Sequence, residues 1–437
     1  MVTLRSYQVR ALGQLAEAFR AGKRAPLIVS PTGSGKTVMM SRVVAGHVAK
    51  GGRVTWFAHR RELIQQAADT LRSFELEVGA FGEGAAAPVQ ILSVQGVLSR
   101  REMPPCTMAC IDEAHHASAD EWETVFRATK DAGALILGAT ATPERGDGRG
   151  LGMFDAIIVA AQIKELIAAG SLVPCDWQGP KRKVPRGKLA RTPLYAHQTL
   201  ANGRRNVVFA PSLKAAREWM GHFQTARIHC GLVWGAQKTE ERDDVLARFR
   251  AGQLEVVFNC GVLTEGFDCP EIGMVTIART VGSAGMLIQM AGRGARAAPG
   301  KDSYTLADLS GACLTYGLPD DDREFSLEGV GISRGSGAGA STYRLCKRCK
   351  SELPEDVCVR CGFDNGQEVP GDAGIELGRW DAKRLADDTP DKRAIQLARW
   401  MRKFPGKDAK FYGFRFKAVY GMWPSGEVLS MARRMVG

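Results

Sequence analysis

Short apolar runs alternate with longer stretches of helical periodicity from the amino terminus to about residue 310. Continuous apolar runs are typical of strands that are buried on both faces of a parallel sheet. The stretches between them place apolar residues at helical spacing, so that helices would cover those faces. The pattern therefore predicts an α/β fold with largely parallel sheets.

The predicted elements fall into two halves. In the first half the strands are Ala25–Ser30, Arg53–Ala58, Val89–Ser93, Thr107–Ile111 and Ala134–Ala139. In the second half they are Asn206–Ala210, Leu254–Asn259, Met274–Ala278 and Ser303–Ala307. Helices are predicted over Lys36–Ala49, Arg61–Phe74, Leu213–Phe223, Thr239–Phe249 and Ala284–Ala291.

Two changes in composition divide the chain. Residues 178–205 hold eight Lys and Arg, three prolines and no acidic residue, which is typical of a linker. Residues 328–341 are rich in Gly and Ser and indicate a second joint. We therefore expect a first domain over residues 1–175, a basic linker over 176–205 and a second domain over 206–325. Smaller modules would follow at 342–366 and 375–437.

The overall composition is that of a folded protein with a basic surface. Hydrophobic residues make up 45% of the chain and the formal net charge is +12. No apolar run reaches the roughly 20 residues of a membrane helix, and the amino terminus lacks a signal-peptide pattern, so a cytoplasmic protein is expected. Nucleic acid is the partner that this charge favours, because phosphates attract clustered cations. A generally basic surface is the alternative.

A phosphate-binding loop follows the first predicted strand. The segment Ser30-Pro-Thr-Gly-Ser-Gly-Lys-Thr37 lies between that strand and a helix, as such loops require. Glycines let backbone N–H groups face the phosphates at the positive end of the helix. Lys36 would contact the β- and γ-phosphates, and the Thr37 hydroxyl would bind Mg²⁺. The other residues predicted to contact the nucleotide here are Thr32, Gly33, Ser34 and Gly35.

Two carboxylates come directly after another apolar strand. Asp112-Glu-Ala-His115 follows Thr107–Ile111. Hydrolysis of Mg·ATP needs one carboxylate near the metal and one near the attacking water. Asp112 would hold Mg²⁺, and Glu113 would orient and deprotonate the water. The sequence thus predicts an ATPase site made by two strand ends.

With this loop and this acidic motif in order, the chain resembles the superfamily 2 helicases, through residue 296. Tyr7-Gln8 is similar to the family's adenine-reading glutamine motif, which implies that Gln8 contacts the nucleotide. Gly138-Ala-Thr-Ala-Thr-Pro143 resembles the motif that links hydrolysis to movement. Ala58-His-Arg-Arg-Glu-Leu63, Ser93-Val-Gln95 and Val208-Phe-Ala-Pro-Ser212 resemble motifs that contact nucleic acid.

The resemblance continues in the second half. Leu263-Thr-Glu-Gly-Phe-Asp-Cys-Pro270 resembles the motif in which Gly266 and Asp268 face the nucleotide. Gln289-Met-Ala-Gly-Arg-Gly-Ala-Arg296 resembles the arginine-finger motif. It implies that Gln289, Arg293 and Arg296 act in catalysis, with both arginines directed at the γ-phosphate. Taken alone, two arginines three positions apart are equally typical of a basic surface patch.

The resemblance implies two tandem RecA-like P-loop NTPase domains that clamp ATP. The function it implies is an ATP-dependent helicase or translocase, with DNA favoured over RNA because Gln289 and the DEAH motif resemble DNA-repair, restriction-subunit and phage recombination helicases. The expected setting is replication, repair or recombination in a bacterial or phage-infected cell, with proteins of those processes as partners. The alternatives are an RNA helicase, a nucleic-acid-binding protein switched by ATP, and a scaffold whose ATPase has decayed.

Four cysteines have the spacing of a metal site. Cys346, Cys349, Cys358 and Cys361 form C-x₂-C-x₈-C-x₂-C. Four thiolates on two tight turns suit a structural Zn²⁺ ion, and the spacing resembles that of small zinc ribbons. An iron–sulfur cluster or a redox pair is the alternative. The surrounding cations would either contact nucleic acid or lie in solvent around a metal site that only stabilises the local fold.

The last segment is basic and aromatic. From Gly378 onward there are fourteen Lys and Arg, six Asp and Glu, and nine aromatic residues. Interleaved cations and rings suit contact with nucleic acid through stacking and phosphate binding. The favoured interpretation is a small α-helical module that uses most of these rings as its core.

Overall fold

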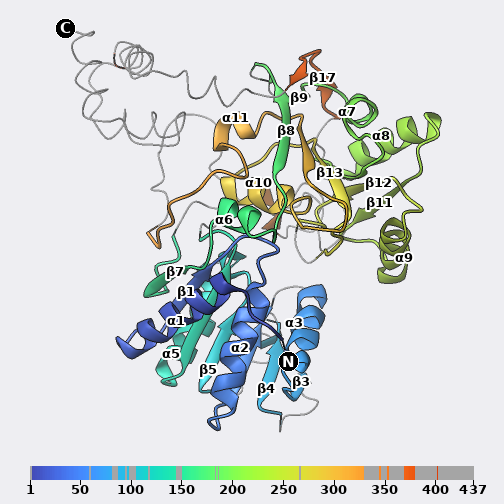
Figure 1. The fold of residues 1–437 in the computed structure, drawn as a ribbon. Helices are drawn as coiled ribbons and strands as arrows, with labels where there is room; N and C mark the ends of the chain where they lie inside the picture. Colours follow the sequence, from blue (N-terminus) through green and yellow to red (C-terminus); the bar gives the residue numbers. More distant parts are fainter. Residues whose placement is uncertain are drawn as a thin grey trace.

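The computed structural model describes residues 2–58, 61–80, 87–93, 96–97, 105–116, 119–143, 150–182, 184–185, 187–264, 267–328, 344–345, 352–353, 369–378 and 401. They form two α/β lobes, each built on a seven-stranded sheet. Figure 1 shows the lobes one above the other, with the amino-terminal lobe below. The predicted fold class is confirmed for these lobes.

The first sheet has the order β3-β4-β2-β5-β6-β1-β7, and all neighbouring strands are parallel. The two edge strands, β3 and β7, were not among the predicted strands. The strands are β1 (Pro26–Val29), β2 (Val54–Phe57), β3 (Val78–Ala80), β4 (Val89–Leu92), β5 (Met108–Ile111), β6 (Leu135–Thr140) and β7 (Ala156–Val159).

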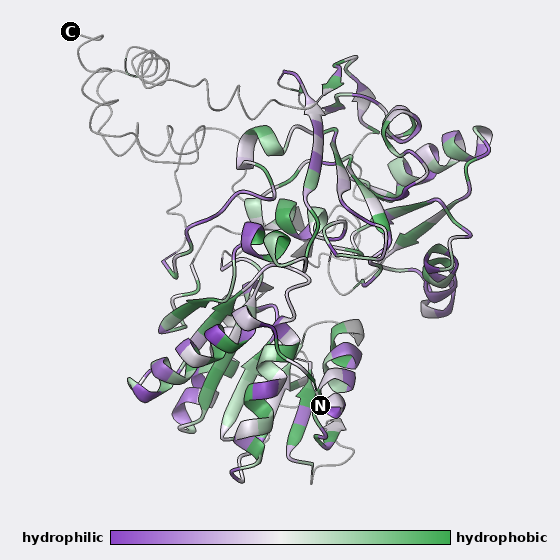
Figure 2. Ribbon diagram, in the orientation of Figure 1, coloured by the Kyte–Doolittle hydropathy of each residue, from purple (hydrophilic) through white to green (hydrophobic). Residues whose placement is uncertain are grey.

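Helices cover both faces of this sheet. Ile28 in β1 packs in a cluster with Met39 of α2, whereas Leu27 and Val29 pack in another cluster with Trp122 of α5. Successive strand residues point to opposite faces, so the whole of β1 is buried. In Figure 2 the strands are correspondingly green and the outer helix faces purple. The helices are α1 (Ser6–Arg20), α2 (Lys36–Val48), α3 (Arg61–Ser73) and α5 (Ala119–Asp131), with the short turn η1 (Ala114–His116).

The second sheet has the order β11-β12-β10-β13-β14-β8-β18. Its strands are parallel except for β18, which pairs antiparallel with β8. The strands are β8 (Cys175–Pro180), β10 (Arg205–Phe209), β11 (Cys230–Trp234), β12 (Val256–Cys260), β13 (Ile272–Ile277), β14 (Tyr304–Asp308) and β18 (Leu377–Gly378). Shorter pairs are β9 (Lys188–Leu189) with β17 (Gly371–Asp372) and β15 (Arg344–Leu345) with β16 (Glu352–Leu353).

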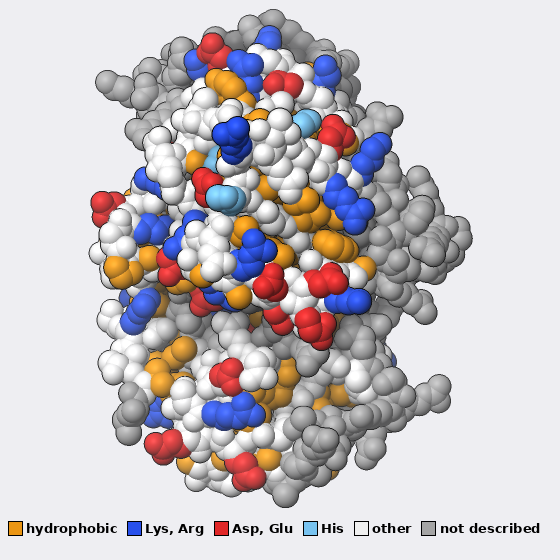
Figure 3. Space-filling model, turned by 90° about the vertical axis from the view of Figure 1, so that its right-hand side faces the viewer, with side chains coloured by type: hydrophobic (Ala, Val, Ile, Leu, Met, Phe, Trp, Pro, Cys, Tyr) orange, Lys and Arg blue, Asp and Glu red, His pale blue; other side chains and the backbone are white. Residues whose placement is uncertain are grey.

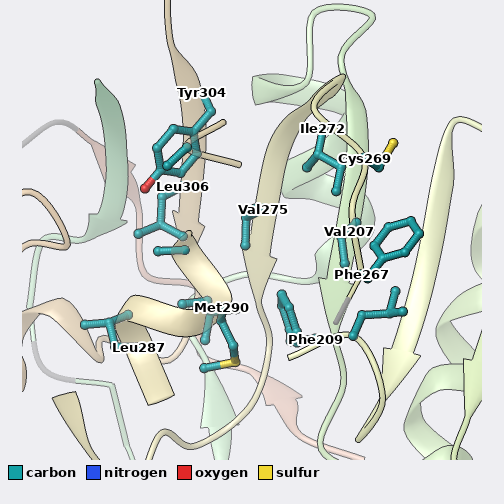
Figure 4. Packing of buried hydrophobic residues seen from close by; sticks show 14 of the residues in the cluster. Val207, Phe209, Phe267, Cys269, Ile272, Val275, Leu287, Met290, Tyr304 and Leu306 are labelled. Atoms are coloured by element: carbon teal, nitrogen blue, oxygen red, sulfur yellow. The ribbon is translucent and has the colours of Figure 1, made fainter. Parts of the chain in front are cut away.

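The second core also has two faces. Phe209, Val275 and Met290 pack together between the sheet and α10, as Figure 4 shows. On the other face Phe258 packs with Phe223 of α8, ring against ring at 5.0 Å between centroids. The helices of this lobe are α6 (Ile163–Ala168), α7 (Pro193–Leu200), α8 (Leu213–Thr225), α9 (Thr239–Arg250), α10 (Ala284–Ala291) and α11 (Cys313–Tyr316).

The prediction of a linker over residues 176–205 is wrong. Strand β8 pairs with β14 inside the second sheet, and α7 packs on α8. The apolar residues of the stretch supply core contacts, since Trp177, Leu189 and Ala196 are buried. Its many surface cations concealed that pattern in the sequence. Similarly, β18 joins the second sheet, although residues 375–378 were assigned to the carboxy-terminal module.

A strap of chain after α11, residues 318–328, connects the two lobes. The Asp320 carboxylate accepts the N–H of Cys175 at 2.8 Å in the second lobe. The amide of Gln162 donates to the Arg323 carbonyl at 2.8 Å. Farther along, Phe325 and Leu327 pack against the core cluster of the first lobe that includes Trp122. The strap is visible in Figure 1 as the orange segment descending towards β7.

Among the helices that the structure describes, none is long and apolar enough to cross a membrane. The four cysteines predicted to bind zinc lie outside the described residues, as do residues 354–368 and nearly all of the carboxy-terminal module. Those predictions stay predictions.

Candidate nucleotide site between the lobes

The phosphate loop lies between β1 and α2, as predicted. Gly33 and Gly35 have φ angles of 83° and 77°, in the left-handed region that glycine adopts without strain. Helix α2 begins at Lys36, and no side chain caps its amino terminus. The free N–H groups of the first turn and the helix dipole therefore make this loop suitable for an anion.

Lys36 is held beside this loop in a buried position. Only 7% of its surface is exposed. Its ammonium donates to the Ser30 carbonyl at 3.2 Å and lies 3.8 Å from the Glu113 carboxylate. A buried ammonium needs anionic or carbonyl partners to offset its desolvation. The position therefore suits a cation that contacts anionic groups beside the phosphate loop.

The acidic motif follows β5 at the same edge of the sheet. Asp112 accepts the N–H of Glu113 at 3.0 Å. Glu113 has a φ of 49°, which is uncommon for a residue with a side chain. Backbone strain of this kind persists only where the surrounding structure holds it, and it is frequent at functional sites.

His115 extends the site from Glu113 to the second lobe. Its Nδ1 lies 3.5 Å from a Glu113 carboxylate oxygen and 2.9 Å from the Thr140 hydroxyl, while its Nε2 lies 2.7 Å from the amide nitrogen of Gln289. An amide nitrogen can only donate, so Nε2 accepts and the ring proton of the neutral imidazole is on Nδ1. The sequence motif named His115 without indicating this contact between the lobes.

One face of α10 rests on the first lobe. Gly285, Gln289 and Gly292 have the spacing of a single helix face. A Cβ atom at Gly285 would lie 2.7 Å from the Thr142 hydroxyl, and one at Gly292 would lie 3.2 Å from the Cβ of Thr32. Glycine therefore permits the close approach of the lobes at two points on either side of Gln289. These glycines were not identified as functional from the sequence.

This contact predicts an unusual effect for Gly285→Ala. Alanine should stabilise the first turn of α10, by up to about 1 kcal/mol, because glycine is the poorer helix former. It should also separate Thr142 from the helix and lower ATP turnover by about tenfold, since small displacements of catalytic groups are costly. Thermal unfolding and steady-state ATPase assays measure the two effects.

Gly282→Ala is the matched control, because a Cβ there would meet nothing within 4 Å. It should change neither quantity. A Gly285→Ala variant with normal turnover would contradict the importance of this contact.

Arg296 lies at the phosphate loop. Its Cγ is 3.3 Å from the position that a Cβ on Gly33 would take, so it crosses from the second lobe to the first. Its guanidinium forms an ion pair with Asp268. Burial lowers the pKa of the Arg296 guanidinium from its ordinary value, but an arginine stays charged. Arg296 therefore lies against the phosphate loop, and its role as a finger stays a prediction.

Lys301 supports this arginine through the backbone. Its ammonium donates to the Arg296 carbonyl at 2.9 Å and to the Pro270 carbonyl at 2.7 Å. Burial lowers the pKa of Lys301 to about 8. The lysine thus joins the end of the Asp268 motif to the end of the arginine motif, a role that nothing in the sequence indicated.

Arg293 differs from the sequence-based expectation. It is 4% exposed, and its guanidinium donates to the Phe267 carbonyl at 2.7 Å within its own lobe. The structure therefore brings one of the two predicted arginines, Arg296, to the phosphate loop. The other lies in the second core, where it supports the segment that contains Asp268.

The amino-terminal motif contacts the loop through two side chains. Gln8 donates from its amide to the Ser34 carbonyl at 3.0 Å, and the Tyr7 hydroxyl donates to the same carbonyl at 2.6 Å. The Gln8 amide oxygen accepts the N–H of Arg5 at 2.9 Å. Gln8 therefore lies at the predicted site, and the buried Tyr7 is an additional residue that positions the loop.

Of the other predicted site residues, one is placed by the structure and one is not described. Thr37 lies in the first turn of α2, beside Lys36. Gly266 lies outside the described residues. No group of three or more His, Cys, Asp or Glu side chains within the described part of the chain has the arrangement of a metal site.

Comparison with protein families gives a match to each lobe in order. The family model of the type III restriction enzyme res subunit matches residues 1–145, and that of the helicase conserved C-terminal domain matches residues 190–298. Together they cover more than half of the chain. The chain belongs to the superfamily 2 helicases. It therefore carries both domains of an ATP-hydrolysing enzyme of this family.

Individual relatives are distant. This helicase is 26% identical over 364 residues to a 51.5 kDa protein of a Lactococcus phage, across 77% of this chain and 78% of that protein. It is 28% identical over 381 residues to a Saccharomyces cerevisiae protein assigned as the ATP-dependent helicase IRC3. That match covers 74% of this helicase but 55% of the yeast protein, so the chain spans little more than half of that relative.

Solved structures share the fold. A fragment assigned to an HsdR subunit of a type I restriction enzyme from Vibrio vulnificus matches with a TM-score of 0.60 at 21% identity, over 73% of this helicase and 67% of that chain. Saccharomyces cerevisiae Dbp5 bound to RNA and ADP BeF3 matches with a TM-score of 0.51 at 16% identity, over 73% and 93%. These identities support the fold and not a particular substrate.

Proposed function

We propose that this helicase couples ATP hydrolysis to movement along nucleic acid, with DNA as its preferred substrate. The observation that carries the proposal is the polar path from Glu113 through His115 to Gln289. It connects the carboxylate at the centre of the first lobe's site to a helix of the second lobe. Through these contacts, a change at the hydrolysis site would alter the position of the second lobe.

The residues around the loop fit a nucleoside triphosphate. The uncapped amino terminus of α2 and the buried Lys36 would bind the β- and γ-phosphates, and Gln8 lies beside the same loop. Thr37 and Asp112 offer the oxygen ligands that Mg²⁺ prefers. When bound there, the ion would neutralise charge on the phosphate oxygens.

Glu113 and Arg296 would carry the chemical step. The Glu113 carboxylate would accept a proton as a water oxygen attacks the γ-phosphorus, while the bond to the β-phosphate oxygen breaks and ADP leaves. Arg296 would stabilise the negative charge that spreads over the transferring group. Arg293 would act indirectly, by holding Phe267 next to Asp268.

Two considerations support DNA as the polymer. The family model that matches the first lobe describes a restriction-enzyme subunit. Distant matches include UvrABC system protein B sequences, at 28% identity over 49% of this chain in one case. The net charge of +12 suits RNA as well as DNA. An RNA helicase is therefore the second candidate.

The decisive measurement is the ATPase rate of the full chain with no polymer, single-stranded DNA, duplex DNA, forked DNA and RNA. We expect at least a tenfold stimulation by DNA and a weaker one by RNA, because polymer contact across both lobes would favour the aligned site. Unwinding of the forked DNA then separates a helicase from a translocase.

A rate that no polymer changes would contradict the motor and leave an ATP-switched binding protein. Stimulation by RNA alone would establish the second candidate. A zinc ribbon at Cys346, Cys349, Cys358 and Cys361, the carboxy-terminal module and a role in replication, repair or recombination belong to the same proposal, and none of them is needed for the ATPase step.

A further inference from the structure

Three parallel strands of the second lobe end level with one another. Phe209 of β10 and Val233 of β11 both pair with Asn259 of β12, and Trp234 pairs with Cys260. The side chain of Asn259 accepts the N–H groups of Val262 and Leu263 at 2.9 and 2.8 Å and so fixes the loop that follows β12. Open α/β sheets bind their ligands beyond such carboxyl ends.

Trp234 stands at this edge. The residue is half-buried, whereas Trp177 and Trp219 of the same lobe are 7% and 4% exposed. The guanidinium of Arg217, on the exposed side of α8, lies 5.6 Å from the centre of the indole. An aromatic face and a cation are thus fixed together at the end of the edge strand β11.

Exposed residues of both charges occur on the segments that flank Trp234. Lys214 lies three positions before Arg217 on α8, and Lys238 lies just before α9; both are exposed. Glu240 and Glu241 follow in the first turn of α9. Figure 3, the face that carries α8 and α9, shows apolar side chains at the surface between Lys, Arg and acidic residues.

We propose that Trp234 and Arg217 form a stacking site for an unpaired base of a nucleic-acid strand. This inference rests on the proposed function and adds a contact outside the sequence motifs of the helicase. The base would stack on the face of the indole that Arg217 does not cover, and Arg217 would meet the adjoining phosphate. Stacking is tolerant of sequence because every base presents a flat face.

The chain contains a matched aromatic–cation pair elsewhere. Tyr195 of α7 is 41% exposed, and Arg191 lies 4.8 Å over its ring. Helix α7 packs against α8 and near β14, and β14 is four strands away from β11 in the strand order. Tyr195→Ala therefore removes an exposed ring of the same kind without touching the proposed site.

The test compares full-length Trp234→Ala, Trp234→Phe and Tyr195→Ala with the unmodified chain. The probe is fluorescein-labelled oligothymidine, and an abasic strand of equal length supplies the same phosphates without bases. Fluorescence anisotropy gives the Kd for each. Removal of a stacking residue is worth about 1–3 kcal/mol per base, which corresponds to roughly a 5- to 150-fold rise in Kd.

We expect Trp234→Ala to lose that affinity for oligothymidine but to bind the abasic strand as the unmodified chain does. Trp234→Phe should retain most of the affinity, and Tyr195→Ala all of it. An unchanged Kd in Trp234→Ala, or an equal loss for both strands, would overturn the stacking site. If the unmodified chain neither binds these strands nor responds to them in the ATPase assay, the proposed function itself fails.

Discussion

Glu113→Gln should lower ATP turnover by about 10²- to 10⁴-fold, the range that general bases contribute. The amide keeps the size of the side chain but cannot accept the proton of the attacking water. It also removes the negative charge that lies 3.8 Å from Lys36 and 3.5 Å from His115. Lys36 is then more available to phosphates, so ATP should bind at least as tightly. Single-turnover hydrolysis and equilibrium ATP binding measure the two effects.

Glu75→Gln is the control for this substitution. Glu75 is exposed and has a φ of 61°, so it shares the left-handed backbone of Glu113 without its contacts. It should hydrolyse ATP normally. Normal turnover by Glu113→Gln would show that another group takes the proton.

The second large effect is expected for Arg296→Ala. A finger arginine is worth about 10³–10⁵ in rate where it has been measured in other NTPases. Arg296 is the arginine that reaches Gly33, so its loss should reduce kcat by a factor in that range. Its ion pair with Asp268 involves a half-exposed carboxylate, and thermal stability should change little. Steady-state kinetics and thermal unfolding separate the two quantities.

Arg293→Ala should behave differently. The buried guanidinium donates to the Phe267 carbonyl, and its removal leaves that carbonyl without this donor, at a cost of about 1–3 kcal/mol in unfolding free energy. Arg248→Ala, on the exposed side of α9, serves as the surface control. If Arg293→Ala keeps the unfolding free energy of the unmodified chain and Arg296→Ala loses it, then Arg296 is the structural arginine and Arg293 the finger.

The parts of this site that depend on local chain geometry were predictable. A phosphate-binding loop between a buried strand and a helix needs glycine where its backbone is left-handed. Gly33 and Gly35 occupy such positions. The bounds predicted for α10, Ala284–Ala291, agree with the structure because its apolar spacing is regular. Asp112 and Glu113 follow β5 as expected. Their chemical roles stay proposals until they are tested.

The parts that depend on tertiary contact were not predictable. Arg293 and Arg296 are three positions apart and equivalent in the sequence, yet one points into its own lobe and the other crosses to Gly33. The two side chains point in different directions because the chain turns after α10. Likewise, the role of β8 in the second sheet depends on pairing with β14, far along the chain.

The strap over residues 318–328 has a mechanical consequence for the segment that follows it. The strap ends with Leu327 packed on the first lobe, whereas Val369 and β17 lie in the second lobe. The covalent chain between these two attachments includes the four cysteines. A chain cannot span more than about 3.3–3.6 Å per residue, so its number of residues sets an upper limit on how far the two attachments can move apart.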